Sequence, residues 1–170
     1  MTIDKKYVDY FHNVSARAAL ASHYLVGKKD KIAADKAAVD SMRTHLNKID
    51  MNGQIVIGEG ELDEAPMLYI NEKLGTGIGP ELDIAVDPLE GTNFAANNLP
   101  GALSVIAVSE KENLFKAPET YMHKIAISSS ENGIVDLDNS VSQNIKNLAE
   151  YKNTEPNKLT ACLLDRPRHK

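Results

Sequence analysis

The spacing of apolar residues changes near residue 50, and this change restricts the chain to a fold that mixes helices with strands. Before that point apolar residues recur at intervals of three and four, which is typical of helices with one buried face. They are Val8, Phe11, Val14, Ala18, Ala21 and Leu25 in the first segment, and Ile32, Val39, Met42, Leu46 and Ile49 in the second. The pattern predicts one helix that ends near Gly27 and a second helix closed by a turn at Asn52-Gly53.

Beyond that point, short runs rich in β-branched residues predict strands. These runs are residues 54–57, 82–86, 102–108, 123–127 and 159–164. We also expect a short helix over 66–74 with Pro66 in its first turn, a loop over 75–80, and a helix over 143–150. Two helices followed by mixed strands and helices predict an α+β or layered αβ fold. Because no repeat or linker divides the sequence, we expect residues 1–170 to be one domain or part of one.

Charge and composition exclude several classes of protein. Lys and Arg number 19 against 24 Asp and Glu, which gives a net charge of −5, whereas proteins that bind nucleic acid through its phosphates are usually basic. No apolar run approaches the roughly 20 residues that span a bilayer. The one cysteine, Cys162, cannot form an internal disulfide, which favours a reducing compartment. We therefore expect a soluble, cytoplasmic protein that binds neither nucleic acid nor membrane.

Two acidic motifs directly follow predicted strands. The first is 58–64, GEGELDE, and the second is 87–92, DPLEGT. Asp35 adds a further carboxylate, because it lies four residues before Val39 on the inward stripe of the second predicted helix. Carboxylates gathered at strand ends repel one another, so a fold that collects them usually supplies a cation. Oxygen ligands without neighbouring Cys or His pairs favour Mg²⁺ or Mn²⁺ over zinc.

The spacing within 87–92 points to phosphoryl chemistry. Pro88 fixes the turn, so that the carboxylates of Asp87 and Glu90 can converge on neighbouring cations with the Leu89 carbonyl between them. If a helix begins at Thr92, its free N–H groups would favour a phosphate beside these cations.

Ordinary structural roles also fit each feature taken singly. An Asp-Pro pair is usually a turn, and Glu-Gly-Glu is usually a solvated loop. Asp35 could instead pair with Lys31 or Arg43 on its own helix. Cys162 lies in a predicted apolar strand, where we expect an inert buried thiol instead of a nucleophile.

Several motifs together resemble a known family. DPLEGT, followed by Asn93-Phe94, resembles the DP(I/L)(D/E)GT signature of lithium-sensitive, metal-dependent phosphomonoesterases. Within that superfamily, residues 30–35, 58–67 and 166–169 resemble class II fructose-1,6-bisphosphatase, the GlpX type of bacteria. The resemblance implies a layered αβαβα sugar-phosphatase sandwich, of which this chain resembles the N-terminal half. The C-terminal half, with a further acidic metal ligand, is then absent from this chain.

The resemblance also implies roles for individual residues. The divalent-metal ligands, with Mn²⁺ or Mg²⁺ as cofactor, would be Asp35, Glu59, Asp87 and Glu90. Asp35, Glu59 and Thr92 would be catalytic, with Thr92 orienting the attacking water. The contacts to a sugar bisphosphate would be Glu90, Gly91, Thr92, Tyr121, Arg166, Pro167 and Arg168. Guanidinium groups suit phosphate because they donate two parallel hydrogen bonds.

The activity implied is metal-dependent hydrolysis of the 1-phosphate of fructose 1,6-bisphosphate, a step of gluconeogenesis. Two alternatives stay open. One keeps the chemistry and changes the sugar, for example to sedoheptulose 1,7-bisphosphate. The other treats the chain as a noncatalytic fragment or assembly module. As partners we expect a second copy, in a homo-oligomer, or the missing C-terminal half.

Overall fold

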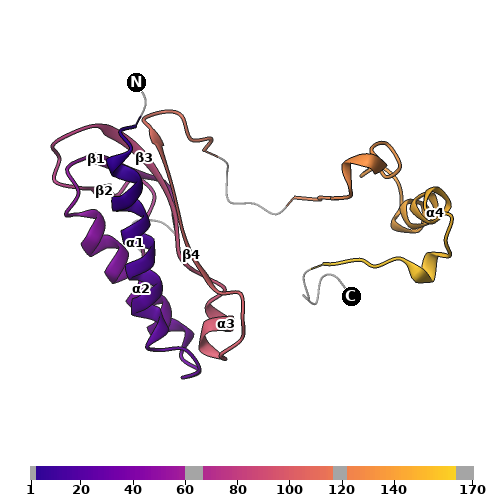
Figure 1. The fold of residues 1–170 in the computed structure, drawn as a ribbon, viewed down its shortest axis with the longest axis horizontal. Coiled ribbons are helices and arrows are strands. Elements are labelled where there is room, and N and C mark those ends of the chain that lie inside the picture. The colour runs from indigo at the N-terminus through magenta and orange to yellow at the C-terminus, as the bar shows by residue number, and fades with distance from the viewer. Residues whose placement is uncertain (1–2, 60–66, 117–121, 164–170) are drawn as a thin grey trace. The chain divides into compact units, whose positions relative to one another are not determined.

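The computed structural model describes residues 3–59, 67–116 and 122–163. The chain forms two compact units, Met1–Pro118 and Glu119–Lys170. The first unit holds most of the helices and strands, and the second is built around one helix (Figure 1). The predicted mixture of helices and strands is confirmed, and the layered αβαβα sandwich stays a prediction. Among the described residues, no helix is long and apolar enough to cross a membrane.

The first unit places two helices against a four-stranded sheet. The helices are α1 (Lys6–His23) and α2 (Lys31–Leu46), which lie side by side (Figure 1). The strands are β1 (Asn52–Ile57), β2 (Lys73–Leu74), β3 (Glu81–Glu90) and β4 (Leu103–Glu110). Their order in the sheet is β2-β1-β3-β4, with β1 and β3 parallel and the other pairs antiparallel. The core forms where residues such as Val14, Met42 and Ile84 are buried between helices and sheet.

Both predicted helices exist, but their buried faces differ slightly from the expected stripes. Val8 is 65% exposed, because α1 buries the row of Tyr7, Phe11, Val14, Ala18 and Ser22 instead. Ile32 is 74% exposed for a similar reason. The buried face of α2 consists of Ala34, Ala38, Val39, Met42 and Leu46. Small alanines on this face allow α2 to pack closely, a preference that a count of large apolar residues does not detect.

The predicted turn at Asn52-Gly53 is wrong, because both residues belong to β1. The Asn52 N–H donates to the Pro80 carbonyl at 2.9 Å, where β1 begins beside β3. A Cβ on Gly53 would lie 2.8 Å from Cδ1 of Ile84. Glycine is therefore required at this position by close packing against β3, and not by a turn.

The predicted helix over 66–74 is also wrong for the residues that the structure describes. Residues 67–72 form an irregular segment that leads into β2. Asn71 has a φ of 74°, which an α-helix does not tolerate, and the Tyr69 N–H donates to the Glu72 carboxylate at 3.3 Å. The loop over 75–80 and the strand over 102–108 are confirmed, the latter as β4. Pro66 lies outside the described residues.

The strand predicted over 82–86 continues beyond its expected end. β3 runs through Asp87 and Pro88 to Glu90, and a break in the pairing register takes the place of the expected stop. Asp87 pairs with Val105 and Glu90 pairs with Leu103, so β3 has one more residue than β4 between these pairs. Such a bulge accommodates a proline, which lacks the N–H of a regular ladder.

The second unit confirms one prediction and corrects three others. The helix predicted over 143–150 is α4 (Val141–Tyr151), which begins where the Ser140 hydroxyl accepts from the Gln143 N–H at 3.1 Å. The segments 123–127 and 159–163 are not strands, because within the described part of this unit neither pairs with another strand. The thiol of Cys162 is exposed and not buried, for the same reason. Two 3₁₀ turns, Ser129–Glu131 and Pro156–Lys158, flank α4 in the sequence.

Candidate metal and phosphate site

The sheet topology brings Glu59 of the first acidic motif to the same edge as Asp87 and Glu90 of the second. Because β1 and β3 are parallel, their carboxyl ends lie at the same edge of the sheet. Ile57 pairs with Ala85, so the chain just beyond β1 reaches Glu59 beside the part of β3 that carries Asp87. Glu90 ends β3 after the bulge. Carboxyl ends of neighbouring parallel strands are where open αβ sheets commonly bind ligands.

Backbone hydrogen bonds attach the beginning of α2 to the segment that follows this edge. The N–H groups of Gly27 and Lys29 donate to the carbonyls of Ala95 and Ala96 at 2.9 and 2.8 Å. Asp30 caps α2 by accepting from the Ala33 N–H at 2.9 Å. The short helix α3 (Thr92–Ala96) is thereby joined to the turn before α2, whose second turn contains Asp35.

The four predicted carboxylates perturb one another. Burial, together with the negative charges of Asp35, Asp87 and Glu90, raises the pKa of Glu59 to about 7. Burial also raises the pKa of Asp87 to about 6, with a side-chain hydrogen bond to Glu90 as the next contribution. Burial raises the pKa of Asp35 as well. Perturbed carboxyl groups concentrated in this way are typical of functional sites.

Several oxygens of this acidic cluster (Asp35, Glu59, Asp87 and Glu90) lack partners. Asp35 Oδ1, Glu59 Oε2 and Asp87 Oδ1 are buried and have no hydrogen-bond partner among the described residues. A buried carboxylate oxygen without a partner is costly, and a divalent cation would satisfy it. The donor set, all oxygen, fits Mg²⁺ or Mn²⁺. Within the described ranges, however, no three such side chains already surround a single point as a finished metal site.

The glycine and threonine of the DPLEGT motif form the junction between strand and helix. Gly91 has a left-handed conformation, with φ 81° and ψ 44°, which glycine adopts without strain. The short helix α3 begins at Thr92, which is the helix start that the phosphate interpretation of this motif requires. Gly91 and Thr92 therefore directly follow Glu90 of the acidic cluster, at the turn between β3 and α3.

The remaining predicted contacts do not fall within the described residues. Tyr121, Arg166, Pro167 and Arg168 all lie outside them, so their assignment to the substrate stays a prediction. The ligand roles of the acidic cluster also stay predictions, although the structure brings its carboxylates close enough to perturb one another.

Sequence reasoning missed one ion pair near this cluster. Arg43, considered above as a partner of Asp35, instead pairs with Glu72, at 2.7 Å between Nε and Oε1. Glu72 is one of the few buried charged residues of the first unit. Little in the sequence indicates that Glu72 is buried, because a helix over 66–74 provides no reason to bury a carboxylate. Arg43 does follow Val39 by four residues, at the edge of the buried face of α2.

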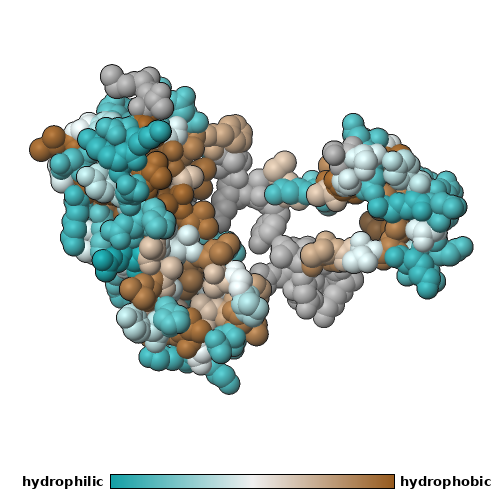
Figure 2. All heavy atoms as spheres, in the orientation of Figure 1, coloured by the Kyte–Doolittle hydropathy of each residue, from teal (hydrophilic) through white to brown (hydrophobic). Residues whose placement is uncertain are grey.

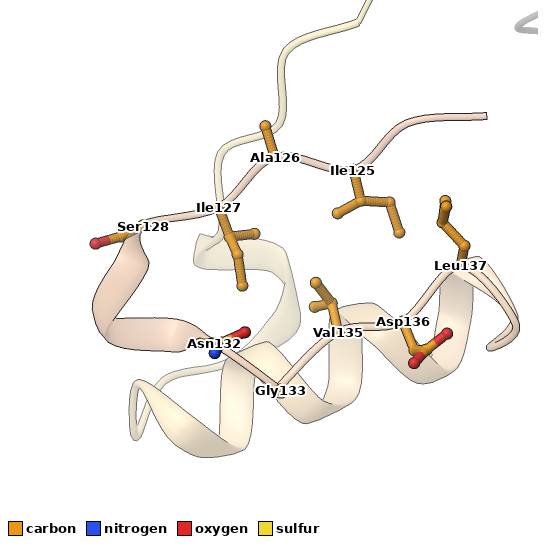
Figure 3. A pocket seen from close by; sticks show the side chains of 9 residues that line it. All are labelled: Ile125, Ala126, Ile127, Ser128, Asn132, Gly133, Val135, Asp136 and Leu137. Carbon is orange, nitrogen blue, oxygen red and sulfur yellow. The ribbon is translucent and has the colours of Figure 1, made fainter. Parts of the chain in front are cut away.

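An open groove in the second unit has few side chains that could take part in catalysis. Figure 3 shows Ile125, Ile127, Val135 and Leu137 directed into the space between an extended segment and the chain before α4. The groove measures about 650 Å³ and has one carboxylate, Asp136, among its lining residues. Asp136 accepts a hydrogen bond from the Asp138 N–H, as expected for a turn. We assign this groove no catalytic role.

Comparison with known proteins is consistent with the acidic cluster. The family described as "Bacterial fructose-1,6-bisphosphatase, glpX-encoded" matches residues 5–170. A curated protein of Synechococcus sp. (strain CC9311), named D-fructose 1,6-bisphosphatase class 2/sedoheptulose 1,7-bisphosphatase, is 48% identical over 168 residues, or 99% of this chain and 50% of the relative. A protein of the same name from Prochlorococcus marinus (strain MIT 9312) is 50% identical over 92% of this chain and 47% of its own length. The chain therefore spans about half the length of these relatives.

Proposed function

This chain belongs to the family of bacterial, glpX-encoded fructose-1,6-bisphosphatases, and from that premise we propose that it supplies the metal-binding and phosphate-binding part of a sugar bisphosphatase. The reaction is hydrolysis of the 1-phosphate of fructose 1,6-bisphosphate. The oxygen of water attacks phosphorus, the bond from phosphorus to the sugar oxygen breaks, and that oxygen gains a proton. The products are fructose 6-phosphate and inorganic phosphate, as in gluconeogenesis.

One observation carries this proposal: carboxylate oxygens of Asp35, Glu59 and Asp87 are buried with no hydrogen-bond partner in the part of the chain that the structure describes. Asp35, Glu59, Asp87 and Glu90 would hold Mg²⁺ or Mn²⁺, as the all-oxygen donor set favours. The cations would neutralise phosphate charge and lower the pKa of bound water. Asp35 and Glu59 count as catalytic in this proposal because they hold the cations that activate water.

Residues of the turn and of the chain beyond it would bind the phosphate. The Thr92 hydroxyl can accept and donate hydrogen bonds, which suits a group that orients the attacking water. Glu90 and Gly91 would contact the sugar and phosphate from the same turn. Tyr121 and 166–168, with Arg166, Pro167 and Arg168, would hold the rest of the bisphosphate, since a guanidinium group forms two parallel hydrogen bonds with phosphate.

The complete enzyme would have the layered αβαβα architecture and act in the cytoplasm. Because this chain spans about half of its relatives, we propose that turnover requires either a second copy in a homo-oligomer or a segment equivalent to the other half. Sedoheptulose 1,7-bisphosphate is a second candidate substrate, favoured by the double name of the relatives. A noncatalytic assembly role would leave the acidic cluster without a use.

Titration calorimetry with Mn²⁺ tests the metal site directly. We expect saturable binding by the 170-residue chain, weakened at least about tenfold in Asp87→Asn. Asp136→Asn serves as the control, because Asp136 lies in the second unit away from the acidic cluster in sequence. Equal affinities of Asp87→Asn and the unmodified chain would remove the metal from this turn.

An activity assay then tests the reaction and the sugar. The chain alone should release little or no phosphate from fructose 1,6-bisphosphate, and supplying the C-terminal half of a relative, fused or in trans, should restore release. Comparing the two bisphosphates identifies the preferred sugar. Full turnover by a 170-residue monomer would contradict the need for a second part, and no turnover by the completed protein with Mn²⁺ would contradict the reaction.

A further inference from the structure

An ion pair joins α2 to residues 67–72, called the return segment below. Nε of Arg43 donates to Glu72 Oε1 at 2.7 Å, and Nη2 donates to Glu72 Oε2 at 3.1 Å. The same Nη2 also donates to the Met67 carbonyl. The carboxylate of Glu72 is nearly buried, and two parallel bonds of this kind fix both direction and distance. Arg43 therefore holds both ends of the return segment against α2.

The return segment in turn holds the backbone that carries Glu59. The Glu59 N–H donates to the Leu68 carbonyl at 3.0 Å, and Leu68 is fully buried. Further along, Ile55 donates to the Glu72 carbonyl at 3.0 Å and accepts from the Asn71 N–H at 2.8 Å. A Cβ on Gly58 would lie 2.3 Å from the Leu68 carbonyl oxygen. The end of β1 and the return segment are therefore in tight contact just before Glu59.

The same helix that carries Arg43 also carries Asp35, eight residues earlier. A helix is rigid over this length, roughly 12 Å. Asp35 and Glu59 are therefore connected through α2, the three hydrogen bonds of Arg43 and the return segment, in addition to their shared place at the edge of the sheet. Because the Glu59 backbone is bonded to this segment, movement of the return segment would move Glu59 relative to Asp35.

We propose that Arg43 is a positioning residue that sets the place of the Glu59 carboxylate relative to Asp35, and thereby the affinity of this site for a divalent cation. The inference rests on the proposed function, since it assumes that these carboxylates bind the cation. Arg43 acts on Glu59 through Met67, Glu72 and Leu68, and not through a bond to the carboxylate of Asp35 or of Glu59. Outer groups that orient metal ligands typically change affinity by about ten to one hundredfold when they are altered.

Arg43→Lys in the 170-residue chain is the primary test. Lysine keeps the positive charge but cannot donate in parallel to Glu72 and also to the Met67 carbonyl. We expect Mn²⁺ affinity to fall about tenfold and the Glu59 amide to exchange with solvent several times faster. Glu72→Gln, which keeps the shape of the side chain, should move both measurements in the same direction.

Two controls separate positioning from general loss of stability. Val14→Ala weakens the core under α1 without touching the return segment, and its melting temperature can be compared with that of Arg43→Lys. Lys36→Met removes an exposed ion pair with Asp40 on the same helix. Both controls should bind Mn²⁺ within about twofold of the unmodified chain, and an equal loss in Val14→Ala would overturn the proposal.

The two proposals fail in different ways. If the unmodified chain binds no Mn²⁺, the proposed metal site is refuted. The positioning role of Arg43 is then tested by the exchange rate of the Glu59 amide alone. Faster exchange in Arg43→Lys than in Val14→Ala then supports positioning, and equal exchange overturns it. If the unmodified chain binds Mn²⁺ and Arg43→Lys binds it equally well, the metal site stands and Arg43 has no positioning role.

Discussion

Asp87 and Glu90 lie on either side of the bulge in β3, where Asp87 pairs with Val105 and Glu90 pairs with Leu103. Burial, with the neighbouring Glu90 carboxyl group as the next contribution, raises the pKa of Asp87 to about 6. Near and below that pH, a cation that binds here must displace a proton. The protonation state of the acidic cluster is therefore coupled to metal binding.

Mn²⁺ affinity should rise between about pH 5.5 and pH 8. The pKa values of Asp87 and Glu59, about 6 and about 7, lie inside this window, and only the ionised carboxylates bind the cation. Calorimetry in buffers with different ionisation enthalpies should detect protons released at pH 6 and few at pH 8. Proton release that is the same in Glu59→Gln as in the unmodified chain would contradict this assignment of the proton.

Without a divalent cation, the acidic cluster should lower stability as pH rises. Burial raises the folded-state pKa of Glu59 from 4.5 to about 7, so between these values the folded chain keeps a proton that the unfolded chain has lost. The contribution of Glu59 to the free energy of unfolding therefore falls across this window. Glu59→Gln should melt a few degrees higher than the unmodified chain at pH 8 and about equally at pH 4.

Thermal melting in a chelator checks this prediction. Asp9→Asn, an exposed change on α1, is the matched control and should not reproduce the higher melting temperature at pH 8. A lower melting temperature for Glu59→Gln at pH 8 would mean that the Glu59 charge has a stabilising partner.

Gly58→Ala and Gly53→Ala should separate two kinds of damage. A Cβ on Gly58 would lie 2.3 Å from the Leu68 carbonyl oxygen, and one on Gly53 would lie 2.8 Å from the Ile84 side chain. Both should cost about 1 to 3 kcal/mol of stability, because each overpacks a tight contact. Only Gly58→Ala should also weaken Mn²⁺ binding, since it moves the backbone next to Glu59. Denaturant titration and calorimetry measure the two effects, and equal metal affinities would contradict the distinction.

The face of β4 that turns away from the helices should cause self-association. Leu103 is 59% exposed and Val105 is 44% exposed, and Figure 2 shows apolar residues along the side of the first unit where β4 lies. Exposed apolar patches on a sheet favour association. Leu103→Thr with Val105→Thr keeps strand-forming side chains and should shift the chain toward the monomer in light scattering. Ile78→Thr, in an exposed loop, is the control and should change nothing.

The pattern of apolar residues was enough to predict α1, α2, β4 and α4, because each obeys a local rule of periodicity or capping. The same rule failed where a residue serves a distant contact. Gly53 looked like part of a turn, yet it is needed for packing against Ile84 across the sheet. Residues 67–74 looked helical, although the Arg43 pair and the backbone of β1 hold them in an irregular path.

The sequence alone specifies the chemistry available to this protein, namely oxygen ligands and a DPLEGT motif. That Asp35, Glu59, Asp87 and Glu90 influence one another depends on the tertiary structure, because they come from three separate segments of the chain. Parallel pairing of β1 with β3, and the hydrogen bonds that join the start of α2 to α3, bring them to one edge. Carboxylate repulsion depends on distance in space, and spacing along a chain does not fix that distance until the sheet has formed.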